Sequence, residues 1–298
     1  MSLAHGGYKS PQARQRFLRV YYALRALSPS PDVVHDVATE FGRVRVYQHG
    51  PAGGVPVVLI HGFFMTSAMW WAQIGDLARD FTVYTIDMLG HPGASVHTTK
   101  MSTAADAARN IDAVLQGLGL GAAHLVGYSY GGWLATHTAA RTPRRVATVT
   151  LIDPAATVVR LSARFWGSLA LLLARPRSKQ AKRAAAWITG HPAPGSPTDL
   201  LTETFVTGFD TFAAPVNTPP VRYTTDQLLQ SVEVPVQVLL AGRSIHNADK
   251  AIRRLDSVVP TWRHRLWPTA SHLLPAEQPD TINACIREFV SEHHSDLR

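Results

Sequence analysis

The stretch Gly127-Tyr128-Ser129-Tyr130-Gly131 follows an apolar run over residues 122–126 and opens a helix-like stretch over residues 132–136. This is the pattern of a strand, a sharp turn and a helix, with a serine at the apex of the turn. The backbone at such a turn is strained, so small neighbours are needed where the chain folds back on itself. Gly127 and Gly131 supply that room. The pattern predicts that the Ser129 hydroxyl is held clear of a sheet and aimed at a ligand.

Around this turn the chain alternates between strands and helices. An antiparallel hairpin is expected from 33–41 and 44–48, and apolar runs predict strands at 55–60, 81–86, 122–126, 146–152, 234–240 and 262–267. Helical spacing predicts helices at 11–27, 67–79 and 103–118, after Ser129, from about 247, and over 279–292. Strands separated by helices of this length favour a mostly parallel twisted sheet wrapped by helices on both faces.

The alternation breaks between residues 155 and 231. This segment holds helix-like runs at 161–174 and 179–188, followed by what we expect to be a loop rich in Pro, Gly and Thr. We therefore divide the chain into an N-terminal helical extension (1–31), an α/β core (32–155 and 231–298) and an inserted helical lid (156–230). An insertion at the C-terminal edge of a parallel sheet lies where ligands bind, so the lid is expected to cover Ser129.

Composition bounds the class of protein. The 298 residues are 46 % apolar and 17 % charged, as in a globular protein with a substantial core. The single cysteine, Cys285, excludes an internal disulfide, and we expect a soluble, cytoplasmic protein because no secretion signal or bilayer-length apolar run is visible. The net charge of +8 comes without any nucleic-acid-binding motif, so it predicts a solvated basic surface and no nucleic-acid partner.

A serine hydroxyl needs a base to accept its proton before it becomes a good nucleophile. His272 is the predicted base, because it lies between the last strand and the last helix, in a loop that reaches the edge where Ser129 sits. The order of serine before histidine fits hydrolases of this type. His61 is predicted to be a structural hydrogen-bonding residue, and His246 is interpreted as a loop histidine without a partner pattern.

The attack also needs donors for the oxyanion that it creates. His61-Gly62-Phe63-Phe64 follows the strand at 55–60, and Gly62 allows the backbone to turn back over the sheet. The backbone N–H groups of Phe63 and Tyr130 are the predicted oxyanion hole.

Several short motifs together resemble one family. They are His61-Gly62, the loop Asp87-x-x-Gly90-x-x-Gly93-x-Ser95, the turn around Ser129, and His272 followed by Glu277 and Pro279. The chain resembles α/β-hydrolase-fold proteins over nearly its whole length, and it looks most like bacterial carboxylesterases with a helical lid. The resemblance implies an α/β-hydrolase fold and ester hydrolysis. It also implies that Asp87, Glu277 and Pro279 shape loops and cap helices.

One part departs from the family pattern. Most such hydrolases carry the acid of the catalytic triad shortly after the seventh strand, where this chain has Ser244 and Ile245. Asp153, at the end of the strand over 146–152, is the preferred replacement, because pancreatic-type lipases and some haloalkane dehalogenases use an acid at that neighbouring strand end. Asp249 is the second candidate. If neither acid contacts His272, the chain is a slow hydrolase or a non-hydrolytic member of the family.

The pocket is expected to be apolar. Phe64 near the oxyanion loop, with Phe165 and Trp166 in the lid, are the predicted substrate-binding residues, suited to an acyl chain or an aromatic group. We therefore predict a serine hydrolase that cleaves a carboxylic ester through an acyl-enzyme on Ser129. No metal or organic cofactor has support in the sequence.

Two alternatives to a simple esterase remain open. The lid carries a basic run, which indicates a solvated helix face or a docking site for an acidic carrier protein that presents a thioester; its residues are Arg175, Arg177, Lys179, Lys182 and Arg183. A biosynthetic thioesterase or cyclase-like enzyme is therefore one alternative. A non-hydrolytic protein with an incomplete triad is the other.

Overall fold

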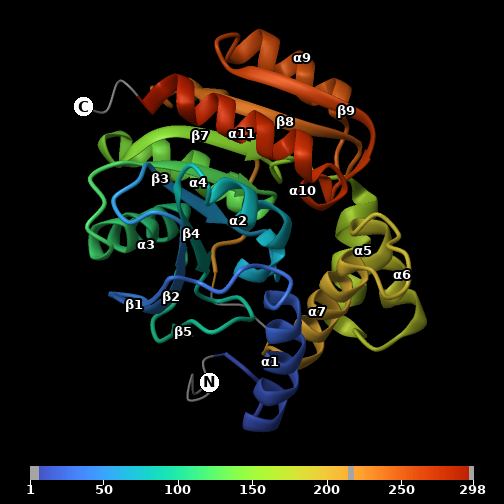
Figure 1. Cartoon of the computed structure of the whole chain (residues 1–298). Coiled ribbons are helices and arrows are strands. Elements are labelled where there is room, and N and C mark those ends of the chain that lie inside the picture. The colour runs from blue at the N-terminus through green and yellow to red at the C-terminus, as the bar shows by residue number, and fades with distance from the viewer. Residues whose placement is uncertain (1–6, 214–217, 295–298) are drawn as a thin grey trace.

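The computed structural model describes residues 7–213 and 218–294, which form one nine-stranded sheet with helices on both faces (Figure 1). The strand order is β1-β2-β4-β3-β6-β7-β8-β9, and β5 pairs with β2. The pairs formed by β2 are antiparallel, and every other pair is parallel. The strands are β1 (Val33–Thr39), β2 (Gly42–His49), β3 (Pro56–Ile60), β4 (Thr82–Asp87), β5 (Val96–His97), β6 (Ala123–Tyr128), β7 (Val146–Ile152), β8 (Val236–Arg243) and β9 (Arg263–Ser271).

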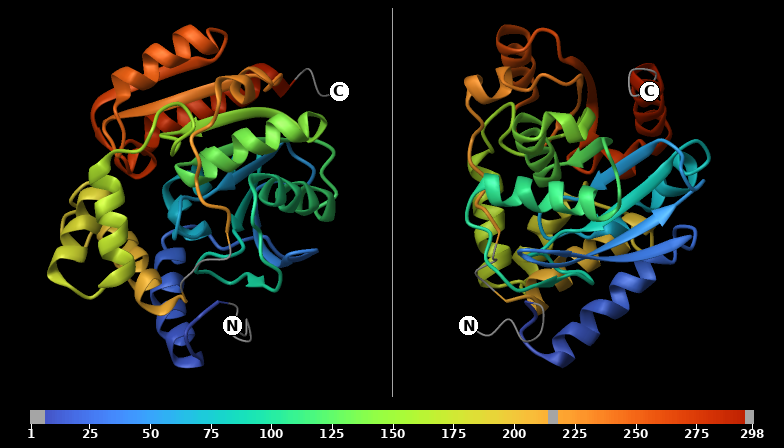
Figure 2. Two further views of the ribbon diagram at one scale, coloured as in Figure 1. Left: turned by 180° about the vertical axis from the view of Figure 1, so that it is seen from behind. Right: turned by 90° about the vertical axis from the view of Figure 1, so that its left-hand side faces the viewer.

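Helices cover both faces of this sheet, and further helices lie to one side of it, as the two views of Figure 2 show. They are α1 (Pro11–Arg25), η1 (Ser67–Trp70), α2 (Trp71–Leu77), α3 (Ala104–Gly117), α4 (Tyr130–Arg141), η2 (Pro143–Arg145), α5 (Ala163–Ala174), α6 (Lys179–Ile188), α7 (Pro197–Thr211), α8 (Asp226–Gln230), α9 (Ala248–Val258), α10 (Leu274–Glu277) and α11 (Pro279–His294).

Period-two alternation along the strands creates two separate cores. Val57 and Leu59 of β3 pack in the core that α1, α2 and α11 cover, whereas Val58 and Ile60 pack in the core that α3, α4 and α9 cover. Strands buried on both faces are nearly continuous apolar runs in the sequence, so the central strands could be predicted from it.

The N-terminal extension is tied to the core through one buried carboxylate. The Tyr21 hydroxyl of α1 donates to Asp87 Oδ2 over 2.8 Å, and the same carboxylate accepts from the backbone N–H groups of Ser67 and Ala94. Phe17, Tyr21 and Leu24 are fully buried. Helix α1 is therefore an integral part of the fold, and Asp87 shapes the loop after β4.

The inserted segment carries α5, α6 and α7, which lie together to one side of the sheet in Figure 1. The expectation of a loop after residue 188 was wrong, because α7 occupies residues 197–211. Ser196 caps this helix by accepting from the Asp199 N–H, and Leu201, Phe205 and Phe209 repeat every four residues to form its buried face. The short β5 was not predicted either. In the part of the chain described, no helix has both the length and the apolar character needed to span a bilayer.

Candidate active site

Ser129 stands at the turn between β6 and α4. Its backbone has φ 52° and ψ −112°, a strained conformation for a residue with a side chain. The turn is so tight that a Cβ on Gly131 would lie 2.1 Å from the Ile60 carbonyl oxygen, and one on Gly127 would lie 2.3 Å from the Gly131 carbonyl oxygen. Glycine is therefore required at both positions, as the sequence pattern predicts.

His272 reaches Ser129 from the loop after β9. Its Nε2 lies 3.0 Å from Ser129 Oγ, and its ring packs against that of Tyr128 with 5.0 Å between the centroids. The loop is held by Glu277, which accepts from both the backbone N–H and the hydroxyl of Ser271. These contacts place the imidazole beside the hydroxyl in the orientation that proton transfer needs.

Asp153 follows the last residue of β7 and contacts the other side of the same imidazole. Its Oδ2 lies 2.5 Å from His272 Nδ1, and its Oδ1 accepts from the Ala241 N–H over 3.0 Å. Burial works against ionisation of this carboxyl, but the neighbouring His246 and His272 rings outweigh it and hold the pKa of Asp153 below its usual value. Asp249, the other candidate, is exposed in the first turn of α9.

Two further residues around this carboxylate were missed in the sequence. Ser244 occupies the position where a triad acid was expected, and its hydroxyl donates to Asp153 Oδ2. His246, interpreted as a loop histidine without a partner, is buried with its Nε2 3.1 Å from Asp153 Oδ1. No local pattern marks His246, because its partner lies 93 residues away across β7 and β8. The one signal in the sequence was that Ser244 stands where most such hydrolases have an acidic residue. This indicates that the loop after β8 contacts a carboxylate from another strand.

Phe63 and Tyr130, whose backbone N–H groups are the predicted oxyanion donors, both line the same cavity as Ser129. Phe64 N–H donates to His91 Nδ1 and Met65 N–H donates to the Gly62 carbonyl, whereas no acceptor for the Phe63 N–H is found among residues 7–213 and 218–294. Tyr130 is the first residue of α4, so its N–H has no acceptor within the helix. Both N–H groups are therefore available to a ligand.

His61 supports this loop from below. Its Nδ1 donates to the Gly62 carbonyl over 2.8 Å, and its Nε2 accepts from the Met88 N–H over 3.0 Å. Burial lowers the pKa of His61 to about 4, so the ring is neutral near pH 7. The prediction of a structural hydrogen-bonding histidine agrees with these contacts.

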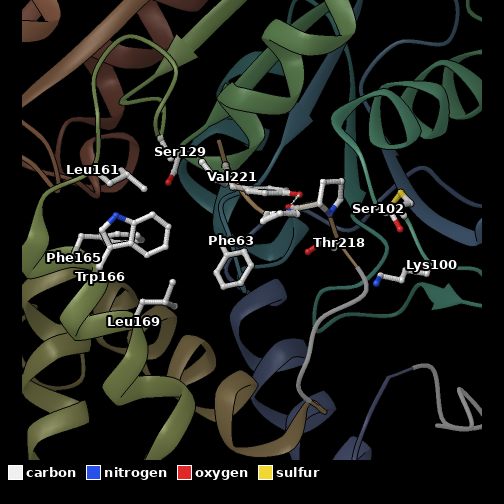
Figure 3. Close-up of a pocket in the computed structure, with 15 residues that line it drawn as sticks. Phe63, Lys100, Ser102, Ser129, Leu161, Phe165, Trp166, Leu169, Thr218 and Val221 are labelled. Atoms are coloured by element: carbon white, nitrogen blue, oxygen red, sulfur yellow. Dashed lines mark hydrogen bonds between the residues drawn. The ribbon is translucent and has the colours of Figure 1, made fainter. Parts of the chain in front are cut away.

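A cavity of about 530 Å³ opens beside Ser129. Figure 3 shows its apolar wall on one side, formed by side chains of the lid, and a more polar end with Lys100, Ser102 and Thr218 on the other side of Phe63. The apolar wall consists of Leu161, Phe165, Trp166 and Leu169. In the described ranges no group of three or more His, Cys, Asp or Glu side chains is placed to hold a metal ion.

Of the three residues predicted to bind substrate, Phe165 and Trp166 lie on the cavity wall and Phe64 does not. Phe64 is 2 % exposed and stacks on Phe209 of α7, with 4.3 Å between the ring centroids. Its backbone is in the left-handed region at φ 57°, and its ring packs into the core beneath the loop. The adjacent Phe63 lines the cavity instead.

Comparison with known proteins identifies the family. Residues 55–235 match the family model of the alpha/beta hydrolase fold. The chain belongs to the α/β-hydrolase family. It is 29 % identical to the carboxylesterase YbfK of Bacillus subtilis (strain 168) over 281 residues, which cover 92 % of this chain and 93 % of that protein. The crystal structure of that esterase, CesB (YbfK), has a TM-score of 0.85 and covers 94 % of this chain and 98 % of its own.

A second relative is similar over the same length. The crystal structure of naproxen esterase (carboxylesterase NP) from Bacillus subtilis is 25 % identical, has a TM-score of 0.85 and covers 94 % of this chain and 99 % of its own. Both likenesses extend through the inserted helices as well as the core, because they cover nearly the whole of each chain.

Proposed function

We propose that this chain is an ester-cleaving serine hydrolase in which Ser129 is the nucleophile, His272 the general base and Asp153 the acid that orients it. The observation that carries the proposal is the single imidazole of His272, which lies 3.0 Å from Ser129 Oγ on one side and 2.5 Å from Asp153 Oδ2 on the other. Two carboxylesterase relatives over nearly the whole chain support the ester-cleaving class.

The first half of the reaction transfers the acyl group to the enzyme. Ser129 Oγ attacks the ester carbonyl carbon while His272 Nε2 takes the hydroxyl proton. The ionised Asp153 stabilises the imidazolium that forms, and the N–H groups of Phe63 and Tyr130 donate to the oxyanion. The tetrahedral intermediate then expels the alcohol, which leaves with the proton returned by His272.

In the second half of the reaction, water hydrolyses the acyl-enzyme with the help of the same residues. His272 Nε2 takes a proton from the water as its oxygen attacks the acyl carbon, and the same proton returns to Ser129 Oγ as the carboxylic acid leaves.

The substrate class follows from the cavity. Its lid wall is built from Leu161, Phe165, Trp166 and Leu169, and side chains of this kind bind apolar acyl or aromatic groups without a polar partner. We therefore propose a small carboxylic ester with an apolar acyl or aromatic group as the substrate.

A thioester on an acidic carrier protein is the second candidate, favoured only by the basic run of the lid. Arg177 of that run pairs with Asp210 within the chain, so part of the charge is already neutralised. A panel of matched oxygen esters and thioesters decides between the two substrates, because the acyl group stays the same while the leaving group changes.

The experiment is hydrolysis of a p-nitrophenyl ester series by the wild type, Ser129→Ala and Asp153→Asn. We expect Ser129→Ala to lose essentially all activity, and Asp153→Asn to fall by up to about 10⁴-fold in kcat because the imidazole loses its orienting carboxylate. Activity that survives Ser129→Ala would end the assignment of the nucleophile. Full activity in Asp153→Asn would end the assignment of the acid alone.

A further inference from the structure

Helix α5 is mostly apolar, with Arg164 and Ser168 as its two polar residues, and only part of it is buried. Leu172 is buried, and Phe165 and Leu169 face the cavity. The opposite side is an exposed stripe without a polar side chain, spaced at three and four residues along the helix; it consists of Ala163, Trp166, Gly167, Ala170, Leu173 and Ala174. We refer to these six residues as the α5 stripe.

The exposure of the α5 stripe is large for an apolar surface. The side chains of Trp166 and Leu173 are 48 % and 44 % exposed, which places both among the most exposed large apolar residues in the described structure. Soluble proteins rarely expose a contiguous apolar patch, and such a patch marks a site of interaction with a protein or a membrane. The stripe therefore indicates a partner surface that is itself apolar.

The segment that carries the stripe is strongly basic. Between Pro154 and Thr198 the sequence holds seven Lys and Arg residues and no Asp or Glu. Three of the seven are engaged inside the chain. Arg160 stacks over the Tyr223 ring at 4.5 Å, Arg164 stacks over the Trp187 ring at 4.2 Å, and Arg177 pairs with Asp210. Four others are exposed and have no ion-pair partner among the described residues, and we call them the lid cations: Arg175, Lys179, Lys182 and Arg183.

We propose that the α5 stripe and the lid cations dock the enzyme on an anionic lipid surface. An apolar helix face flanked by Lys and Arg is the pattern of a helix that lies in a membrane interface, where apolar side chains enter the acyl boundary and cations contact the lipid headgroups. Only the α5 stripe and the lid cations together indicate a lipid surface. Cations alone would attract any polyanion, and an apolar stripe alone would attract any apolar partner.

The charge distribution argues against a second copy of the chain as the occupant. A twofold dimer through the α5 stripe would bring the same cations of both copies together, without an acid in residues 155–198 to compensate them. An acidic protein would satisfy the cations, but it gives no reason for an uninterrupted apolar stripe. A lipid surface satisfies both.

Trp166 connects this surface to the active site. Its side chain is half-exposed on the stripe and also lines the cavity beside Ser129 (Figure 3). Docking through the stripe therefore places the cavity mouth at the lipid boundary, from which a lipophilic ester can enter without crossing water.

Vesicle sedimentation with the full chain tests the proposal. We expect binding to vesicles of equal parts phosphatidylcholine and phosphatidylglycerol, and little binding to phosphatidylcholine alone. Leu173→Asn should weaken binding by about tenfold, and the double variant Lys179→Gln/Lys182→Gln by about thirtyfold. Hydrolysis of a short soluble ester should be unchanged in both variants, because none of these residues lines the cavity. Vesicle binding is measured without substrate turnover, so this test can fail while the proposed hydrolysis holds, and the reverse.

Matched variants elsewhere on the surface are the controls. Val34→Asn removes an apolar side chain of similar exposure (48 %) from β1, and Lys250→Gln/Arg253→Gln removes two exposed cations from α9. Both should bind vesicles as the wild type does.

No binding of the wild type to anionic vesicles would overturn the proposal. Loss of binding in the charge variant but not in Leu173→Asn would also overturn it, in favour of an acidic protein partner. A stable dimer that Leu173→Asn dissociates would assign the stripe to a second copy of the chain.

Discussion

The Asp153 carboxylate contacts two histidine rings, His272 and His246. The contact with His246 leads to a testable prediction. His246 does not touch the cavity, but its Nε2 lies 3.1 Å from Asp153 Oδ1 in a buried position. In His246→Leu the carboxylate loses this partner and orients His272 less well, so we expect kcat to fall by about tenfold to a hundredfold with little change in KM. His246→Gln, which keeps an N–H donor, should recover part of the loss. Ester hydrolysis kinetics measure both effects.

His264 provides the matched control for that substitution. It also lies near an aspartate, with its Nε2 3.7 Å from Asp256 Oδ1, but the pair is on the surface and neither residue lines the cavity beside Ser129. His264→Leu should leave kcat unchanged. Equal losses in the two variants would mean that His246 contributes general stability only.

His246 and Asp153 show what the sequence cannot reveal at the scale of single residues. The turn around Ser129 and the position of His272 were predictable, because each is marked by neighbours along the chain. The place of Asp153 rested on a strand-end argument, and His246 carried no signal, since both depend on which loops meet above the sheet.

At the scale of elements, the N-terminal helix α1 carries a clear prediction. Tyr21 donates to the buried Asp87 carboxylate, whereas the adjacent Tyr22 is 51 % exposed. Tyr21→Phe leaves a charged acceptor with one donor fewer, so we expect the free energy of unfolding to fall by about 1.5–3 kcal/mol. Tyr22→Phe is the control, and it should change stability by less than about 0.5 kcal/mol. Denaturant unfolding compares the two, and equal stabilities would show that α1 is not anchored through Asp87.

Elements with long periodic patterns were predictable, and irregular ones were not. The central strands β3, β6, β7 and β8 are rich in apolar residues, so their places were clear. Helix α7 was missed because its Pro, Gly and Thr residues resemble a loop, although Ser196 and the spacing of Leu201, Phe205 and Phe209 mark a helix.

At the scale of the whole molecule, several buried histidines make stability depend on pH. Burial lowers the pKa values of four of them to about 4, namely His49, His61, His124 and His137. The unfolded chain, with histidine pKa values near 6.5, binds more protons between pH 6.5 and 4, so stability falls as pH falls through this window. We expect each fully buried ring to contribute about 2 kcal/mol of loss between pH 7 and 5.

Unfolding by urea at pH 7 and pH 5 measures this dependence. His49→Asn removes one buried ring and should flatten the pH profile, whereas His264→Asn removes a more exposed ring and serves as the control. The measured interval between pH 7 and pH 5 lies above the ordinary pKa values of Asp and Glu, about 3.9 and 4.3, so acidic residues contribute little to the difference. Equal wild-type stabilities at the two pH values would contradict the assignment of these rings as buried and neutral.

The central claim concerns one activated hydroxyl, and covalent labelling tests it most directly. A fluorophosphonate probe reacts with a serine only when a neighbouring base removes its proton, and intact-protein mass spectrometry detects the adduct. We predict one adduct per wild-type chain, none on Ser129→Ala, and strongly slowed labelling of His272→Ala. A wild-type chain that stays unlabelled, or a Ser129→Ala chain that is labelled at the wild-type rate, would contradict the account.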